Sequence, residues 1–463
     1  MKQPSEQLNP ATSPGLSKAG AKLSEHRLSN GLRVLLAERH SDPVVAVMLW
    51  YKVGARNESE REAGVSHFLE HMMFKGSQRF GKGSVDRITT ERGGSNNAFT
   101  SYDHTAYWFE LASDRWEQTL EIEADRMRNL LLDPAEFTSE REVVLEELRM
   151  GIDDPWRSLA DRVQAAVFPR HPYRRPIIGF PDTLRGMSVA SMRDYYQRFY
   201  HPGNATLVLA GDFLPQRALQ VAEQHLGSIP LGMAYIEADT FRPASANDDS
   251  LRGEQRLSMH WDDQGKRLCM AWPAAAVGTA DHWTLEVLSE VLAGGRTSRL
   301  FRELVLERGL ATSVSVHGDT RVDGGLFWLL AECAQDADPA ELERRIDLQI
   351  ERLAKQPVTK AELDRVRQKL QASEAHESET ATDLAEDLGS WAVDAQWQLA
   401  LSSLQEVLAV DAPRLQECAA RLLTKDRRVV GWCLPQPKTQ AKSGQSRRAK
   451  QPARRKRSAH KAR

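Results

Sequence analysis

The sequence predicts an α+β fold of two homologous domains, each a mostly antiparallel sheet flanked by helices, related by a pseudo-twofold duplication. Three observations lead to this prediction. Short alternating apolar runs are interspersed with amphipathic helical patterns. The order of these patterns in residues 22–235 recurs in residues 255–436, at a spacing of about 220 residues. Residues 236–254 between them are rich in Pro, Ala, Asn and Asp without a period, which is typical of a linker.

Local patterns define the elements of the first half in chain order. An Asn-Gly pair at residues 30–31 indicates a turn that enters the first strand. Gly93-Gly94 is a strong helix stop. The expected elements are strands over 28–37 and 44–50, helices over 65–74 and 84–92, paired strands over 97–100 and 105–111, helices over 116–131 and through 140–147, a strand over 205–211 and a helix over 214–226.

The second half repeats this plan with a strand over 266–272 and an amphipathic helix over 280–292. That helix ends at Gly294-Gly295, as the helix over 65–74 ends near Gly76. At the position of a histidine motif in the first half, the second half has Leu288-Ser-Glu-Val-Leu292. We therefore expect no metal in residues 255–436.

The composition is that of an ordinary globular protein: of 463 residues, 41% are hydrophobic and 27% charged. No apolar run approaches the roughly eighteen residues of a membrane span. Residues 1–21, which we expect to be disordered, lack an apolar signal segment, so the cytoplasm is the expected location and the periplasm the alternative. The four cysteines form no Cys-x-x-Cys pair, which predicts buried thiols rather than a disulfide frame or a cysteine metal site: Cys269, Cys333, Cys418 and Cys433.

Charge is unevenly distributed along the chain. The whole chain has a net charge of −2, yet residues 438–463 contain eleven Lys or Arg and no Asp or Glu. The remaining body is therefore acidic, which favours cationic peptides in a closed cavity. Residues 437–463 are predicted to form a disordered basic tail. Such a tail can bind nucleic acid or anionic lipid, but without interleaved aromatic residues we favour a solvated tail.

The stretch Gly64-Val-Ser-His-Phe-Leu-Glu-His-Met-Met-Phe-Lys-Gly76 carries the chemistry. On a helix, His67 and His71 project from one face, where two imidazoles can hold a zinc ion at about 2.0–2.1 Å per nitrogen. Glu70 lies on nearly the same face and can take a proton from a water on that metal. This is the inverted His-x-x-Glu-His pattern of zinc peptidases. The alternative is a buried amphipathic helix with two incidental histidines.

A catalytic zinc usually has three protein ligands and a water, and the chain offers a third ligand downstream. Glu140 and Glu147 are seven residues apart on a predicted helix and share one face. By themselves they indicate an acidic, solvated helix side. Together with the histidine motif they indicate a metal site.

His67-x-x-Glu70-His71, followed by Glu140 and Glu147, resembles the pitrilysin/insulinase family of zinc peptidases. Within it, the chain is most similar to the branch with mitochondrial processing peptidase β and its bacterial relatives. The resemblance implies one Zn²⁺ per chain, with His67, His71 and Glu147 as ligands and Glu70 as the general base. It also implies that Glu140 is the carboxylate that orients a ligand histidine.

Other stretches follow the order of that family. The segment over residues 93–100 resembles its strand with an Asn-Ala-x-Thr signature, and Arg170-His-Pro-Tyr173 and Tyr200-His-Pro-Gly-Asn204 also match. An edge strand near a metal can accept an extended peptide as an added strand. The resemblance thus implies a substrate-binding strand made of Asn97, Ala98, Phe99 and Thr100. An ordinary hairpin strand is the alternative.

The chain departs from the family in its second half. Members that act alone or as homodimers carry there an Arg and, seven residues later, a Tyr that bind the substrate or its oxyanion. The corresponding positions are Val305 and Thr312. Loss of a transition-state donor costs roughly 2.7–4 kcal/mol. We therefore expect a heterodimer in which a second homologous subunit supplies the Arg/Tyr pair, or else a slow peptidase.

The sequence as a whole predicts a zinc endopeptidase that cleaves unfolded peptides or short polypeptides. Two other classes of function stay open. One is a scaffold or chaperone-like subunit that has kept zinc but lost turnover, against which the intact Glu70 argues. The other is a nucleic-acid binder that uses the basic tail, whose binding would depend steeply on salt.

Overall fold

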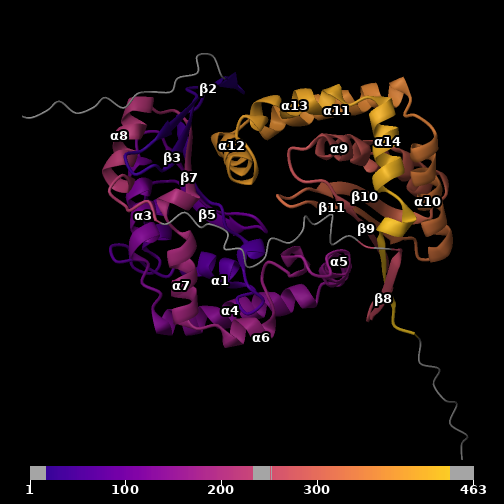
Figure 1. The fold of residues 1–463 in the computed structure, drawn as a ribbon, viewed down its shortest axis with the longest axis horizontal. Coiled ribbons are helices and arrows are strands. Elements are labelled where there is room, and N and C mark those ends of the chain that lie inside the picture. The colour runs from indigo at the N-terminus through magenta and orange to yellow at the C-terminus, as the bar shows by residue number, and fades with distance from the viewer. Residues whose placement is uncertain (1–16, 233–250, 252, 438–463) are drawn as a thin grey trace, which may run out of the picture.

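Two sheets lie on opposite sides of the molecule in the computed structural model, which describes residues 17–232, 251 and 253–437 (Figure 1). The first-half sheet has seven strands. Across the sheet these are β1 (Ser17–Lys18), β2 (Ala21–Arg27), β3 (Arg33–Glu38), β7 (Ala205–Gly211), β4 (Val44–Tyr51), β6 (Thr105–Ala112) and β5 (Ser95–Thr100). The second-half sheet has five, in the order β10 (Ala311–Asp319), β11 (Gly325–Cys333), β9 (Lys266–Ala274), β12 (Val429–Pro435) and β8 (Gln255–Trp261).

The two sheets share one topology. From β3 to β5 and from β8 to β10, corresponding strands follow in the same spatial order. In each sheet one pair is parallel, β3 with β7 and β12 with β8, and all other pairs are antiparallel. The predicted α+β class with two duplicated, mostly antiparallel halves is therefore confirmed. The halves differ in that β1 and β2 extend only the first sheet among the described residues.

Helices cover both faces of each sheet and contain most of the remaining described residues. Those of the first half are α1 (Val65–Met72), α2 (Ser84–Glu91), α3 (Glu117–Asn129), α4 (Pro134–Ile152), α5 (Pro155–Val167), α6 (Pro181–Gly186), α7 (Val189–Phe199) and α8 (Pro215–Leu226), with short turns η1 (Ala55–Asn57), η2 (Pro172–Arg174) and η3 (Pro202–Asn204). Those of the second half are α9 (Ala280–Ala293), the π-helical η4 (Phe301–Glu307), α10 (Pro339–Lys355), α11 (Lys360–Glu377), α12 (Ala381–Asp394), α13 (Leu399–Ala409), α14 (Ala412–Leu422) and the short η5 (Lys425–Arg427).

Each half contributes one helix that packs on the sheet of the other half. Helix α12 of the second half lies on the first sheet, where Leu384 and Leu388 pack with Met48 and Trp50 of β4 in one buried cluster. Helix α5 of the first half lies on the second sheet in the same way, as part of another buried cluster. Figure 1 shows α12 beside the first-half strands and α5 beside the second sheet. Each sheet therefore depends on the other half to bury one of its faces.

A buried polar joint also connects the halves. The β5–β6 turn of the first half carries Asp103, which is 3% exposed and pairs with Arg56 at 2.8 Å. Tyr173 donates its hydroxyl hydrogen to Asp103 at 2.7 Å. From the β10–β11 turn of the second half, the Val322 backbone N–H donates to the same carboxylate at 3.2 Å, and Asp323 pairs with Arg56 at 2.8 Å. The tips of the two corresponding hairpins thus meet at one carboxylate.

Two local predictions about the start of the chain are wrong. The strand predicted over 28–37 is β3 and begins at Arg33 rather than at residue 28, because the Asn30 side-chain oxygen accepts the Leu32 N–H at 3.1 Å and holds residues 28–32 in a turn. Residues 17–21, predicted to be disordered, form β1 and the start of β2, where Lys18 pairs with Asp387 and donates to the Ala400 carbonyl at 2.9 Å.

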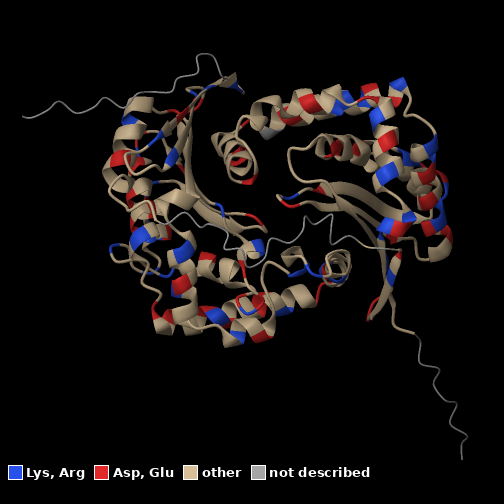
Figure 2. Cartoon of the chain, viewed as in Figure 1, with Lys and Arg blue, Asp and Glu red and all other residues tan. Residues whose placement is uncertain are grey.

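The described residues also bear on the predictions about cysteines and membrane spans. The four cysteines are buried and free, as predicted. Among the described residues, no helix is long and apolar enough to cross a membrane. Charges of both signs alternate along the outer helices α10, α11 and α14 (Figure 2). Three predicted segments lie partly outside the described residues: residues 1–16 of the start predicted over 1–21, residues 236–250 and 252 of the linker predicted over 236–254, and residues 438–463 of the tail predicted over 437–463.

Candidate metal and catalytic site

Helix α1 presents the histidine motif because its apolar residues face the core. Its first residues follow Gly64, which has a φ of 95° and whose Cα lies so close to Ile178 that a Cβ would be 2.5 Å from the Ile178 carbonyl oxygen. Phe68 and Leu69 are fully buried. His67, Glu70 and His71 remain on the partly exposed face.

The N-terminus of α1 is capped by a carboxylate from the preceding connector. Glu58 is 4% exposed and accepts the backbone N–H groups of Gly64 and Ser66, both at 2.8 Å. Unsatisfied N–H groups at a helix start need such an acceptor. Burial raises the pKa of Glu58 to about 7, against these hydrogen bonds. Glu58 thus fixes where the motif helix begins.

Helix α4 brings the downstream carboxylates to the motif. It starts at a proline, and the Asp133 side chain accepts the N–H groups of Ala135 and Glu136 at 2.8 and 3.0 Å. Its buried Phe137 packs on Phe68 of α1 with ring centroids 4.7 Å apart. Glu140 is buried and Glu147 is partly exposed on the same face.

His67, His71 and Glu147 converge. Nε2 of His67 lies 3.7 Å from Oε1 of Glu147, and Nε2 of His71 lies 3.6 Å from Oε2. One donor atom from each of the three residues lies within 4.8 Å of the other two. Two imidazoles and a carboxylate are the donor set of an open zinc site, and tetrahedral ligands at about 2.0–2.2 Å need separations only slightly shorter than these. The residues therefore fit a zinc ion without rearrangement of the backbone.

Hydrogen bonds around the triad orient it. Nδ1 of His71 lies 2.9 Å from Oε1 of Glu140, and Lys75 pairs with the other Glu140 oxygen at 2.5 Å. Although burial opposes it, the hydrogen bonds from Lys75 and His71 hold the pKa of Glu140 below its ordinary value. An ionised Glu140 accepts from Nδ1 and leaves the Nε2 lone pair directed at Glu147. Burial lowers the pKa of His67 to about 4, so this imidazole is neutral as a ligand must be.

Glu70 and strand β5 meet beside the triad. Thr100, the last residue of β5, donates its hydroxyl hydrogen to Oε2 of Glu70 at 2.6 Å. Burial, opposed by this hydrogen bond, raises the pKa of Glu70. A raised pKa suits a carboxylate that must accept and later return a proton near neutral pH.

Strand β5 lies at the end of the first sheet, with β6 on one side. Its other edge pairs with no strand among the described residues. Ala98 packs with the core behind α1, whereas Phe99 packs on Trp50 with ring centroids 5.5 Å apart. By alternation, Thr100 shares the α1 side and Asn97 the α12 side. The exposed Asn97 side chain accepts the N–H of Ala98 at 2.9 Å.

The second half contributes no cationic or phenolic donor at the two positions expected from the family. Val305 in η4 packs against the second core, and Thr312 is exposed on β10, where its hydroxyl donates to the Glu332 carbonyl at 3.4 Å.

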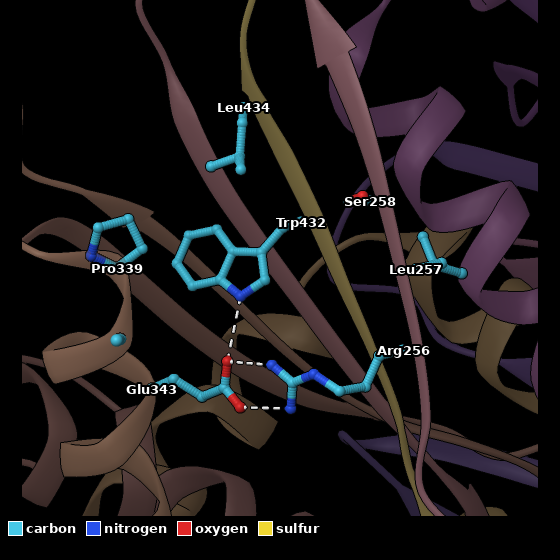
Figure 3. Close-up of a pocket in the computed structure, with 8 residues that line it drawn as sticks. Arg256, Leu257, Ser258, Pro339, Glu343, Trp432 and Leu434 are labelled. Carbon is cyan, nitrogen blue, oxygen red and sulfur yellow. Dashed lines mark hydrogen bonds and ion pairs between the residues drawn. The ribbon is translucent and has the colours of Figure 1, made fainter. Parts of the chain in front are cut away.

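A separate hollow of about 390 Å³ lies between α10 and strands β8 and β12 (Figure 3). Its two charged side chains and its indole bind one another. Arg256 pairs with Glu343 at 2.7 Å, and the Trp432 indole N–H donates to the same carboxylate at 3.1 Å. Because these groups are already paired, we assign no chemistry to this hollow.

Sequence reasoning missed three features of the site. It did not assign a role to Glu58 or Lys75, and it placed Thr100 on the substrate strand without its bond to Glu70. Lys75 lies four residues after His71, and this helical spacing was a signal available in the sequence, although α1 itself ends at Met72. The other two contacts join segments that are not related by a helical or strand period.

The fold and this site define an α+β protein of two duplicated halves, with a potential metal triad in the first half. Residues 33–180 match the insulinase (peptidase family M16) description, and residues 186–370 match the peptidase M16 inactive domain. The chain belongs to the pitrilysin/insulinase family.

Relatives and solved structures agree. The chain is 28% identical over 361 residues to the zinc protease PqqE of Helicobacter pylori, covering 77% of this chain and 80% of that protein. It is 30% identical over 356 residues to the uncharacterized zinc protease Rv2782c of Mycobacterium tuberculosis, covering 76% and 80%. A crystal structure of a protease from Helicobacter pylori superposes with a TM-score of 0.82 at 27% identity, covering 90% of this chain and all of that chain. The crystal structure of pitrilysin has the same fold, with a TM-score of 0.74 at 20% identity, over 94% of this chain and 46% of that chain.

Proposed function

We propose that this chain is a zinc-dependent endopeptidase that hydrolyses unfolded peptides or short polypeptides. The observation that carries the proposal is the position of Glu70. Its carboxylate lies on the same helix face as two imidazoles that converge on Glu147, and Thr100 holds it there. A structural metal site needs no such base. Relatives named zinc proteases support the same conclusion.

In this proposal, His67, His71 and Glu147 hold the zinc ion, and Glu140 keeps the His71 ring in the ligand orientation. A zinc ion held by these residues would polarise the peptide carbonyl and would make water acidic enough to lose a proton at neutral pH. Glu70 accepts that proton as the water attacks the carbonyl carbon. Glu70 then delivers the proton to the leaving amine, which completes hydrolysis.

Substrate binding is proposed at β5. The outer edge of this strand has backbone N–H and C=O groups to which an extended peptide can add as a further strand. Main-chain pairing requires an unfolded segment and depends little on side chains. The residues proposed to form this surface are Asn97, Ala98, Phe99 and Thr100. Residues 22–235 would then form the catalytic domain and residues 255–436 a homologous domain without metal.

We further propose a heterodimer. Val305 and Thr312 supply neither a guanidinium nor a phenol, so a second homologous subunit would provide the Arg/Tyr pair. The same two residues also favour a second candidate function, a zinc-bound scaffold or chaperone-like subunit with weak activity.

Cleavage of a mixture of unfolded peptides by the purified, zinc-loaded chain tests these proposals. We expect slow cleavage that Glu70→Gln abolishes while zinc content stays at one ion per chain. Strong cleavage by the chain alone would contradict the obligatory partner. Bound zinc without cleavage, even after addition of an Arg/Tyr-bearing homologue, would favour the scaffold.

A further inference from the structure

Arg157 lies beside the metal triad without belonging to it. Helix α5 starts directly after α4, and the Asp154 side chain caps it by accepting the N–H groups of Trp156 and Arg157 at 2.8 and 3.3 Å. The chain therefore reverses, and the first turn of α5 lies beside the last turn of α4. The Arg157 side chain is exposed.

The absence of a side chain at Gly151 leaves room for the Arg157 guanidinium. A Cβ at Gly151 of α4 would lie 2.7 Å from both Cζ and Nη1 of Arg157, so the guanidinium rests on the bare helix backbone. Gly151 is one helical turn beyond Glu147 and shares its face. The contact therefore places a positive charge one turn from the triad. That charge contributes, after burial and His71, to the lowered pKa of His67.

The carboxylates around the triad have other partners. Glu140 binds Lys75 and His71, Glu70 binds Thr100, and Glu147 faces the two imidazoles. Asp161, on the next turn of α5, is half-buried, and burial raises its pKa despite the charge of Arg157. Among the described residues, no carboxylate lies within 4.0 Å of the Arg157 guanidinium.

We propose that Arg157 is a specificity-determining residue that binds a carboxylate of the peptide next to the scissile bond. This inference rests on the proposed peptidase function. A planar guanidinium supported on one side and exposed on the other is suited to bidentate binding of a carboxylate. The carboxylate is either an Asp or Glu side chain of the peptide or its C-terminal carboxylate. At Arg157 an acidic group of the peptide would be preferred, although the acidic body of the chain favours cationic peptides elsewhere.

Binding to the Glu70→Gln chain tests the proposal without turnover. Fluorescent ten-residue peptides of one sequence would carry either Gln or Glu at successive positions, each with a free or an amidated C-terminus. We expect at least one carboxylate peptide to bind about five- to twentyfold more tightly than its neutral match, as measured by fluorescence anisotropy. The Glu series and the free-acid series separate the two sources of the carboxylate.

Substitutions then test whether Arg157 causes the tighter binding of the carboxylate peptide. Arg157→Ala should remove the discrimination and leave the binding of neutral peptides unchanged, and Arg157→Lys should keep part of it. Gly151→Ala keeps the charge but displaces the guanidinium, so it should weaken discrimination. Arg149→Ala is the matched control, since Arg149 lies on α4 and pairs with Glu146 at 2.6 Å.

Discrimination that survives Arg157→Ala, or an equal loss of affinity for all peptides, would overturn the role of Arg157. In the active chain, the same discrimination should appear in KM and not in kcat. If the wild-type chain cleaves no peptide even with an Arg/Tyr-bearing homologue present, while the binding discrimination persists, the proposed peptidase function fails and only the binding of a peptide carboxylate by Arg157 stands.

Discussion

The Thr100 hydroxyl donates to Oε2 of Glu70 at 2.6 Å, which joins the last residue of an edge strand to the proposed base. Thr100→Val keeps the shape of the side chain but removes the donor. A hydrogen bond to a charged group contributes roughly 1.5–3 kcal/mol, so we expect kcat to fall about ten- to a hundredfold with a small change in KM. Steady-state kinetics on a peptide substrate measures this. Thr100→Ser should restore most of the rate; failure of this rescue would show that Thr100 acts through packing.

Glu140 should control metal affinity rather than peptide binding. Glu140→Gln removes the charge that orients His71, and loss of such a partner typically weakens metal binding about 10–100-fold. Competition between the protein and a zinc chelator measures the change. Glu142→Gln is the control, because Glu142 lies on the same helix but is exposed. Equal zinc affinity in both variants would contradict the role of Glu140.

Glu58 should make stability depend on pH. Its pKa is raised from 4.5 to about 7 in the folded chain, so folding disfavours its charged form. The resulting stability is fully present below pH 4.5 and is lost as pH rises through 7, by roughly 3 kcal/mol. Urea unfolding at pH 5.5 and pH 8 should show that Glu58→Gln flattens this part of the wild-type pH dependence. An unchanged difference between the two pH values would exclude Glu58 as its source.

Asp103 should stabilise the joint between the halves. Asp103→Asn leaves the buried Arg56 with one carboxylate fewer, and breaking a buried pair destabilises by roughly 3–5 kcal/mol. The free energy of unfolding measures this loss. Asp114→Asn removes an exposed carboxylate of the first half and should change stability by less than about 0.5 kcal/mol. Similar effects of the two substitutions would mean that the joint contributes little.

Much of the site could be predicted because its parts are local. The spacing of His67, Glu70 and His71 needs only a helical period, and so does that of Glu140 and Glu147. The duplicated sheets were predictable from the order of patterned segments. Strand β2 was not, since only Ala21 and Leu23 of its seven residues are buried. Contacts such as Thr100 with Glu70, or Arg157 with Gly151, depend on how separate elements pack. The periodicity of the sequence predicts single helices and strands but not the packing between them.

The exchange of α5 and α12 has a consequence for the history of the duplication. Either half alone would expose one apolar sheet face. A single ancestral half would therefore have been stable only as a dimer in which a helix of each copy covered the sheet of the other. Fusion of two copies would preserve this mutual packing of helix on sheet, and one copy could then lose its metal ligands. Separately expressed halves of the present chain should therefore be soluble together and aggregate apart.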